Sequence, residues 1–221
     1  MSSDITRSSD ITSSPAERTV VHLVRHGEVF NPERILYGRR PGYRLSKRGQ
    51  KQAAATAASL ASHDVTYLVA SPLQRAQETA RPFAAELGLE INTDERLLEA
   101  GNQFEGLHIK GVRSQLWNPK RWPLLKDPRI PSWGEPYEEI AERMMQAVEA
   151  ARDAARGHEA VCVSHQLPIV CVQRLVAGKP FFHNPAVRKC NLASVTSLIY
   201  SGNDLIGWEY SEPASGIKKE K

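Results

Sequence analysis

Two periods of apolar residues alternate along most of the chain, one typical of strands and the other of helices. Short runs rich in β-branched residues predict strands at 19–25, 65–70, near 89–93 and at 159–164. Longer stretches with apolar residues three and four positions apart predict helices at 47–61, 72–87, 136–156 and 168–177. This order favours an α/β fold, which we expect to be a three-layer αβα sandwich around a mostly parallel central sheet.

Local signals agree with these boundaries. Ser46 is placed to cap the first helix, and Ser71 followed by Pro72 is expected to cap and start the second. Gly88 is suited to end that second helix, because glycine readily adopts the left-handed conformation found there. A final hairpin is predicted at 192–210.

The two ends and one internal stretch lack these periods. Residues 1–18 are predicted to form a disordered leader and 212–221 a polar tail, so the folded domain is expected to span 19–211. Residues 106–134 accumulate prolines and aromatic residues without a regular pattern, and we expect them to form an irregular cap insertion over a ligand site. The tryptophans of this insertion are Trp117, Trp122 and Trp133.

The composition is that of a globular protein. Of the 221 residues, 41% are hydrophobic, which is sufficient for a buried core. No apolar run approaches the roughly 20 residues that span a bilayer, so no membrane partner is expected. The N-terminus lacks the pattern of a secretory signal, which favours a cytoplasmic location. Cys162, Cys171 and Cys190 show no paired spacing and are interpreted as core residues.

The distribution of charge limits the classes of partner. The net charge is +4, and basic residues lie among acidic ones over most of the length, so nucleic-acid binding is not predicted. The stretch 110–129 is an exception, because Asp127 is its only acidic residue among several basic ones. This stretch would suit an anionic ligand, although a solvated basic loop explains the same pattern.

Polar side chains that can bind or react with a ligand follow three of the predicted strands. Arg25 ends the first strand and His26 follows it. Arg75 lies shortly after the second strand, and His165 comes after the strand at 159–164. Because the carboxyl ends of parallel strands share one edge, where ligands of α/β sheets bind, we expect these four side chains to meet.

Two arginines with two histidines suit a phosphate group. Each guanidinium can donate paired hydrogen bonds to phosphate oxygens and stays charged at any working pH. A neutral histidine offers a nitrogen lone pair, so a phosphohistidine intermediate is feasible without a metal. His22 would lie about 13 Å from His26 along an extended strand, and no cluster of acidic residues or cysteines accompanies them at ligand spacing. Neither a metal nor another cofactor is predicted.

Several segments resemble the histidine phosphatase superfamily, also called the phosphoglycerate mutase-like family. They are the Leu-Val-Arg-His-Gly-Glu signature at 23–28, Leu-Ser-Lys-Arg-Gly-Gln at 45–50, Ser-Pro-Leu-Gln-Arg at 71–75 and Val-Ser-His at 163–165. The resemblance covers roughly residues 19–210.

This resemblance implies a role for each matched residue. His26 would be the nucleophile. The phosphoryl group would be held by Arg25, Arg75 and His165. Members of the family use a carboxylic acid to protonate the leaving oxygen, and the Leu-Leu-Glu segment that ends at Glu99 assigns this role to Glu99.

Three positions depart from the family pattern. The spacing around the acid is one residue short, so Glu105 is a weaker candidate for the acid, or a surface salt-bridge partner. The asparagine that contacts phosphate appears one place early as Asn31, which is predicted to bind substrate or to form a turn before Pro32. Gln166 replaces the usual glycine after the second histidine, where it would bind substrate or narrow the pocket.

The sequence therefore predicts a metal-independent phosphatase that hydrolyses a small phosphorylated metabolite through a phosphohistidine intermediate. A phosphoglycerate mutase, which returns the phosphoryl group to its substrate, is the alternative within this class. A noncatalytic module that binds a phospholigand is the alternative of another class. The sequence predicts neither the natural substrate nor the oligomeric state.

Overall fold

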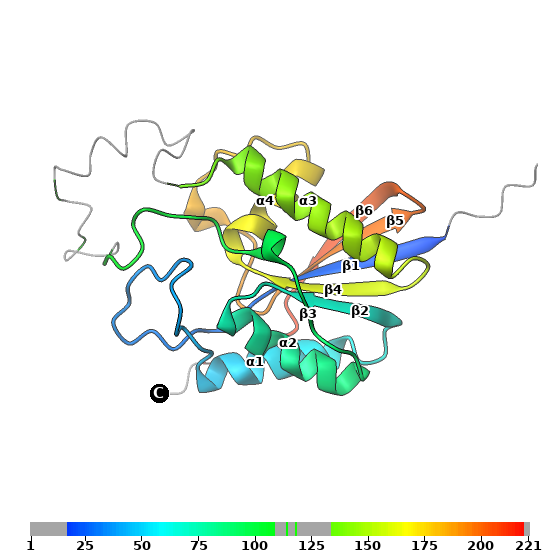
Figure 1. The fold of residues 1–221 in the computed structure, drawn as a ribbon, viewed down its shortest axis with the longest axis horizontal. Coiled ribbons are helices and arrows are strands. Elements are labelled where there is room, and N and C mark those ends of the chain that lie inside the picture. The colour runs from blue at the N-terminus through cyan, green and yellow to red at the C-terminus, as the bar shows by residue number, and fades with distance from the viewer. Residues whose placement is uncertain (1–16, 109–113, 115–117, 119–133, 219–221) are drawn as a thin grey trace, which may run out of the picture.

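A six-stranded sheet lies at the centre of the fold, with the strand order β3-β2-β4-β1-β5-β6 (Figure 1). The computed structural model describes residues 17–108, 114, 118 and 134–218. The strands are β1 (Arg18–Arg25), β2 (Val65–Ala70), β3 (Asn92–Thr93), β4 (Glu159–Ser164), β5 (Val195–Ser201) and β6 (Asp204–Ser211). The first four are parallel, whereas β5 and β6 form an antiparallel hairpin beside β1. The mostly parallel sheet is confirmed.

Helices cover both faces of this sheet (Figure 1). One face carries α1 (Lys47–Ser59) and α2 (Gln74–Leu87), and the other carries α3 (Tyr137–Ala154) and α4 (Gln166–Val176). The described residues also form the short 3₁₀ helices η1 (Glu95–Leu97) and η4 (Pro185–Val187). Each helix pair encloses its own apolar core against the sheet, and burial of that surface drives the layers together. The three-layer sandwich is confirmed, as is the burial of the three cysteines, whose thiols are free.

Most element boundaries agree with the prediction, and helix caps explain two of them. The Ser46 side chain accepts a hydrogen bond from the Gly49 N–H and so caps α1. Gly88 ends α2 in the left-handed conformation, with a φ of 67°. The predicted start of α4 at Pro168 is late, because proline is tolerated in the first turn, where N–H groups have no partner within the helix.

The predicted cap of α2 is wrong. The helix begins at Gln74, and Leu73 before it makes no side-chain capping bond. The Ser71 hydroxyl lies instead 2.8 Å from Nε2 of His165. Ser71 therefore serves the edge of the sheet rather than the helix.

The segment after β6 packs on the domain as far as Ile217. Ala214 is buried, and Nε of Arg48 donates a hydrogen bond to the Ile217 carbonyl. Residues 1–16 and most of 106–134, including the three tryptophans of the insertion, lie outside the described residues. The disordered leader and the cap insertion remain predictions.

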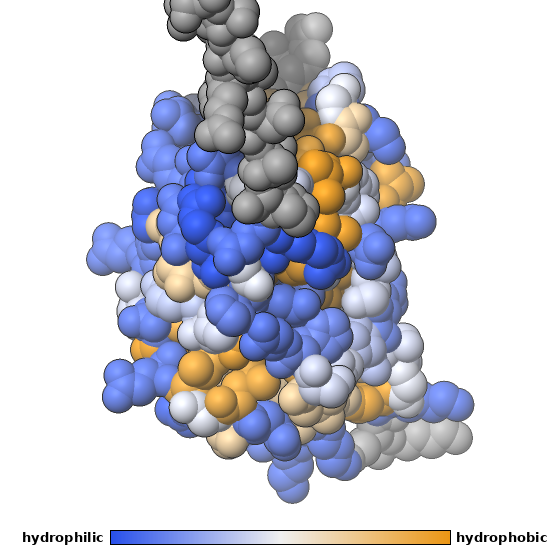
Figure 2. All heavy atoms as spheres, turned by 90° about the vertical axis from the view of Figure 1, so that its right-hand side faces the viewer, coloured by the Kyte–Doolittle hydropathy of each residue, from blue (hydrophilic) through white to orange (hydrophobic). Residues whose placement is uncertain are grey.

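Hydrophilic side chains cover most of the face shown in Figure 2, the side from which β1 starts. Among the helices of the described residues, none is long and apolar enough to cross a membrane.

Candidate active site

The carboxyl edge of the sheet gathers the residues that the sequence singled out. Because β1 and β4 pair in register up to their last residues, His26 and His165 follow them side by side. The centroids of these two rings lie 5.2 Å apart. On its other side β4 pairs with β2, which leads into Ser71 and then into α2 with Arg75.

Close backbone packing fixes the loop that follows β1. A Cβ atom on Gly27 would lie 2.5 Å from the Gly49 carbonyl oxygen, and one on Gly49 would lie 2.0 Å from the Glu28 carbonyl oxygen. Neither position has room for a side chain. The Gly27 N–H also donates to Oγ1 of Thr79 on α2, at 3.1 Å. The loop is therefore held between α1 and α2.

Glu28 explains why α1 begins with a polar motif. Its carboxylate accepts hydrogen bonds from the Ser46 hydroxyl at 2.7 Å and the Arg48 guanidinium at 3.1 Å. Its N–H donates to Oε1 of Gln52 at 2.9 Å. These bonds hold the loop after β1 in place. The side chains of Ser46, Arg48 and Gln52 can do this without contacting a ligand.

His26 is held in its neutral form, with a free lone pair on one ring nitrogen. Its Nδ1 lies 2.8 Å from the Gly27 carbonyl oxygen. A carbonyl only accepts hydrogen bonds, so the proton of the neutral ring sits on Nδ1 and Nε2 keeps its lone pair. Burial, and then the charges of Arg75 and Arg25, lower the pKa of His26 well below 6.5. The ring is therefore neutral at neutral pH.

His165 is also buried, and it depends on Ser71. Burial, and then the charge of Arg75, lower the pKa of His165 well below 6.5, so the ring carries a single proton. Oγ of Ser71 accepts a hydrogen bond from the Leu73 N–H at 3.5 Å and lies 2.8 Å from Nε2 of His165. When the Ser71 hydroxyl donates its proton to Nε2, the proton of the ring lies on Nδ1, a buried atom without a partner among the described residues.

Arg25 and Arg75 supply two guanidinium groups. Nη1 of Arg25 donates to the Cys190 carbonyl at 2.6 Å, and Nη2 of Arg75 donates to the Gly38 carbonyl at 2.7 Å. The Arg75 guanidinium also lies over the ring of Tyr37, 4.9 Å from its centroid. Both arginines are thereby oriented by the protein before any ligand binds.

Unpartnered buried nitrogens concentrate in this group of residues. In the described part of the chain, five buried side-chain polar atoms lack a hydrogen-bond partner, and the three nitrogens among them are Nε of Arg25, Nε of Arg75 and Nδ1 of His165. Each such atom costs about 1–3 kcal/mol when left unpaired. The cluster therefore suits a ligand that supplies acceptor atoms, and its positive charge favours an anion.

A frame of ion pairs positions the segment that carries Glu99. Glu135 accepts hydrogen bonds from Arg143 at 2.6 Å and from Arg39 at 2.8 Å. Burial alone would raise the pKa of Glu135, but the hydrogen bonds and charge of Arg143 lower it. Arg143 also donates to the Leu98 carbonyl at 2.8 Å, and Nε of Arg39 to the Glu99 carbonyl at 2.6 Å. The backbone around Glu99 is thus fixed on two sides.

Both carboxylates considered as the acid lie within electrostatic reach of the site. Burial lowers the pKa of Arg75, and the charges of Glu99 and then Glu105 act against that change. Among the described residues, Oε1 of Glu99 accepts the neighbouring Ala100 N–H at 3.0 Å, whereas Oε1 of Glu105 accepts the Arg39 N–H at 2.8 Å. Glu105 is thus tied to the loop across from it.

Asn31 and Gln166 bind backbone groups of the site. Nδ2 of Asn31 donates to the Ile35 carbonyl at 2.9 Å, and its Oδ1 accepts the Ile35 N–H at 3.3 Å. Asn31 therefore stabilises a turn, and its role as a substrate ligand remains a prediction. Nε2 of Gln166 donates to the Cys190 carbonyl at 3.3 Å, the same oxygen that binds Arg25.

Comparison with known proteins identifies the family. Residues 21–209 match the histidine phosphatase superfamily (branch 1). The chain belongs to this superfamily. It is 53% identical over 200 residues to "Uncharacterized protein Rv0525" of Mycobacterium tuberculosis, covering 90% of this chain and 98% of the relative. It is 31% identical over 181 residues to "Probable phosphoglycerate mutase GpmB" of Escherichia coli, covering 79% and 83%.

Solved structures share the fold of this histidine phosphatase superfamily member. The mycobacterial glucosyl-3-phosphoglycerate phosphatase Rv2419c superposes with a TM-score of 0.67 and 25% identity, over 89% of this chain and 98% of that one. Bacillus stearothermophilus YhfR superposes with a TM-score of 0.70 and 23% identity, over 91% and 98%. Family, relatives and fold together support phosphatase or mutase-type activity.

Several residues of this histidine phosphatase site were missed by sequence reasoning. Tyr37 lies in an irregular loop without a pattern, yet its ring centroid is 6.5 Å from that of His26. Glu135 meets Arg39 across 96 positions of sequence, a separation that no local pattern reports. The sequence predicts Ser71 as a helix cap because it precedes a proline, and it gives no sign of the contact between Ser71 and His165.

Proposed function

We propose that this protein is a metal-independent phosphatase that hydrolyses a small phosphomonoester through a phosphohistidine on His26. The observation that carries the proposal is the set of unpartnered nitrogens on Arg25, Arg75 and His165 beside a neutral His26. A phosphate dianion brings acceptor oxygens for all three nitrogens. Its two negative charges match the two guanidinium groups, so neutralisation does not require a metal.

In the first step, Nε2 of His26 attacks phosphorus and the bond from phosphorus to the ester oxygen breaks. Glu99 in its protonated form gives its proton to the departing oxygen, so the alcohol leaves neutral. Arg25 and Arg75 hold the equatorial oxygens as their charge changes, and Nδ1–H of His165 donates to one of them.

In the second step, water replaces the alcohol. Glu99, now a carboxylate, takes a proton from the water as its oxygen attacks phosphorus and the bond from phosphorus to Nε2 breaks. Inorganic phosphate leaves, and both His26 and Glu99 return to their starting protonation states. The hydrogen bond from Nδ1 of His26 to the Gly27 carbonyl stabilises the ring throughout the cycle.

Mutase-type transfer is the second candidate, because a relative at 31% identity bears the name of a probable phosphoglycerate mutase. A mutase has to keep the phosphohistidine from water until the substrate takes the phosphoryl group back. We favour hydrolysis because the basic extended motif that follows the catalytic glutamate in mutases has no match in this sequence. The neighbouring glucosyl-3-phosphoglycerate phosphatase fold agrees with this choice.

The experiment is a phosphate-release screen over a panel of phosphorylated metabolites, without a bisphosphoglycerate primer and with a chelator present. We expect release from at least one phosphomonoester and, under rapid alkaline quench, a protein mass increased by one phosphoryl group. The His26→Ala variant should show neither signal. Exchange of phosphoryl groups that needs a primer would favour the mutase, and binding of phosphate compounds without any release would favour a noncatalytic module.

A further inference from the structure

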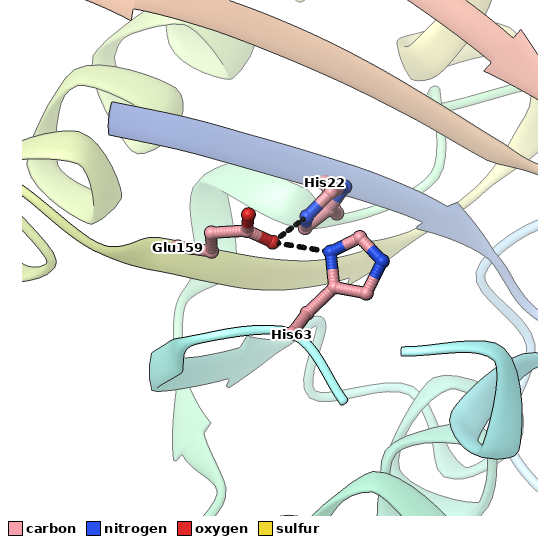
Figure 3. A group of neighbouring side chains, drawn as sticks. All are labelled: His22, His63 and Glu159. Carbon is pink, nitrogen blue, oxygen red and sulfur yellow. Dashed lines mark hydrogen bonds and ion pairs between the residues drawn. The ribbon is translucent and has the colours of Figure 1, made fainter. Parts of the chain in front are cut away.

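A second cluster with two histidines consists of His22, His63 and Glu159 (Figure 3). A single oxygen of Glu159, Oε2, is 2.7 Å from Nε2 of His22 and 2.8 Å from Nδ1 of His63. His22 comes from the middle of β1, Glu159 from the start of β4 and His63 from the turn between α1 and β2. Since His22 precedes His26 by four positions of extended chain, the cluster lies roughly 13 Å from the active site.

The three side chains offer one ligand atom each within a small volume. Their ligand atoms all lie within 4.8 Å of one another. The side chains of His22 and Glu159 are only 5% and 16% exposed, whereas that of His63 is 40% exposed. His22 and Glu159 thus form the buried part of the cluster, and an ion can enter from the exposed side at His63.

Supporting contacts already orient the His22 ring. Its Nδ1 lies 2.8 Å from Oγ of Ser197 on β5. When Nδ1–H donates to that hydroxyl, Nε2 carries a lone pair directed at Glu159, the arrangement by which outer partners orient metal-binding histidines. Solvent reaches the His63 ring, so its proton can reside on Nε2 and leave Nδ1 as the second lone pair.

We propose that this cluster is a binding site for a zinc-type divalent cation, with Nε2 of His22, Nδ1 of His63 and a carboxylate oxygen of Glu159 as ligands. Two imidazoles with one carboxylate suit zinc, whereas calcium and magnesium prefer a full set of oxygens. Bonds of about 2.0–2.1 Å at tetrahedral angles place ligand atoms roughly 3.3 Å apart. The two nitrogen-to-oxygen distances therefore have to widen by about half an ångström, which the exposed His63 turn can provide.

The surroundings leave room for a fourth ligand. The three residues line a cavity of about 350 Å³, together with Ser197, Arg18 and Glu209 among others. A water molecule can complete the coordination there. Arg18 and Glu209 on the cavity wall carry opposite charges, so together they add no net charge to the site. Because its ligands come from β1, β4 and the α1–β2 turn, the cation would join three segments and stabilise the fold.

The test is zinc titration of the full-length protein, prepared without a polyhistidine tag and stripped with a chelator. We expect one equivalent of zinc to bind with a micromolar or lower dissociation constant and to raise the melting temperature. Cobalt(II) should give the intense visible absorption of a four-coordinate site. The His63→Ala variant changes a side chain that is already exposed, and it should lose zinc affinity by at least about tenfold.

The matched control is His158→Ala. His158 is an exposed histidine next to Glu159 in sequence, but it is bonded to Asp64 instead. This variant should bind zinc as the wild type does. Absence of stoichiometric binding to the wild type would overturn the proposal, as would equal affinity in the wild type and His63→Ala, or an equal loss in His158→Ala. In any of these cases the cluster is a hydrogen-bonded trio, with both rings donating to Glu159.

Discussion

Two pairs of histidines beside the same sheet have opposite surroundings. His26 and His165 lie at the carboxyl edge among guanidinium groups, with ring centroids 5.2 Å apart. His22 and His63 share the carboxylate of Glu159, with ring centroids 5.7 Å apart. The spacing of the rings is nearly the same, so it does not distinguish the two pairs. The charge of their neighbours does.

The difference teaches how one residue type serves two chemistries. Burial and neighbouring arginines keep the first pair neutral and leave unpaired donors, so that region suits an anion. In the second region the hydrogen bond with His22 lowers the pKa of Glu159 to about 2, so the rings face a fixed negative charge. That region suits a proton or a cation.

Replacing the proposed nucleophile should give the largest separation between the two regions. We expect His26→Ala to lower kcat by at least about 10⁴-fold, because the covalent step is deleted. His158→Ala, at the other end of β4, should leave kcat unchanged. Steady-state phosphate release measures both, and a His26→Ala enzyme with wild-type turnover would refute the phosphohistidine mechanism.

The two candidate acids can be separated by the leaving group. Glu99→Gln should lower kcat/KM by about 10²–10³-fold for an alkyl phosphate and far less for p-nitrophenyl phosphate, whose leaving group needs little protonation. Glu105→Gln should show no such dependence, since its carboxylate is bonded to the Arg39 N–H. If Glu105→Gln alone shows the leaving-group effect, Glu105 is the acid and the assignment to Glu99 is wrong.

Ser71→Ala tests how the second histidine is positioned. Loss of the hydroxyl frees Nε2 of His165, so the proton no longer has to lie on Nδ1. We expect about a tenfold fall in kcat/KM for alkyl and aryl phosphates alike, with a similar rise in the inhibition constant of inorganic phosphate. An unchanged inhibition constant, with the melting temperature preserved, would show that Ser71 does not position the phosphate-binding ring.

The lowered pKa values of His26 and His165 predict a particular response to acid. As the pH falls through 6.5, both rings stay neutral in the folded protein, whereas the same histidines of the unfolded chain take up protons. Stability is therefore fully present above about pH 6.5 and falls as the pH decreases, by up to about 1.4 kcal/mol per pH unit for each histidine. Urea unfolding at several pH values measures this slope, and His165→Ala should make it shallower.

The same pKa shift fixes the acid limb of the rate profile. The limb of kcat/KM that reports protonation of His26 should lie below pH 6.5. A limb at or above that pH would show that the neighbouring arginines do not keep the ring neutral. The limb is assigned to His26 when the phosphoryl mass label on the protein is lost over the same pH range.

A chelator should have the smallest effect on activity. Hydrolysis should stay within about twofold in excess EDTA, because arginines and histidines neutralise the phosphate in the proposed mechanism. The melting temperature, in contrast, should fall as zinc leaves the His22 cluster. Activity lost in EDTA and restored by a divalent ion would contradict the metal-independent mechanism and remove the contrast between the two regions.

Local sequence was sufficient to predict much of the active-site edge. Arg25, His26 and His165 stand directly at the ends of apolar, β-branched runs, and a parallel sheet brings such ends together whatever the loops between them. Ser46 and Gly88 were likewise placed correctly, because a cap involves residues only a few positions apart. In these cases the signal and the contact lie within the same short segment.

Only the tertiary structure decided which partners these residues have. Ser71 bonds to His165 across 94 positions, and Glu159 bonds to His22 across 137, distances over which no sequence period carries information. The sequence placed His22 in one strand, about 13 Å from His26 and so too far away to share a metal with it, and Glu159 at the start of another strand. Their meeting depends on the order in which β1, β4 and the α1–β2 turn pack, which is set by burial of the whole core rather than by any one motif.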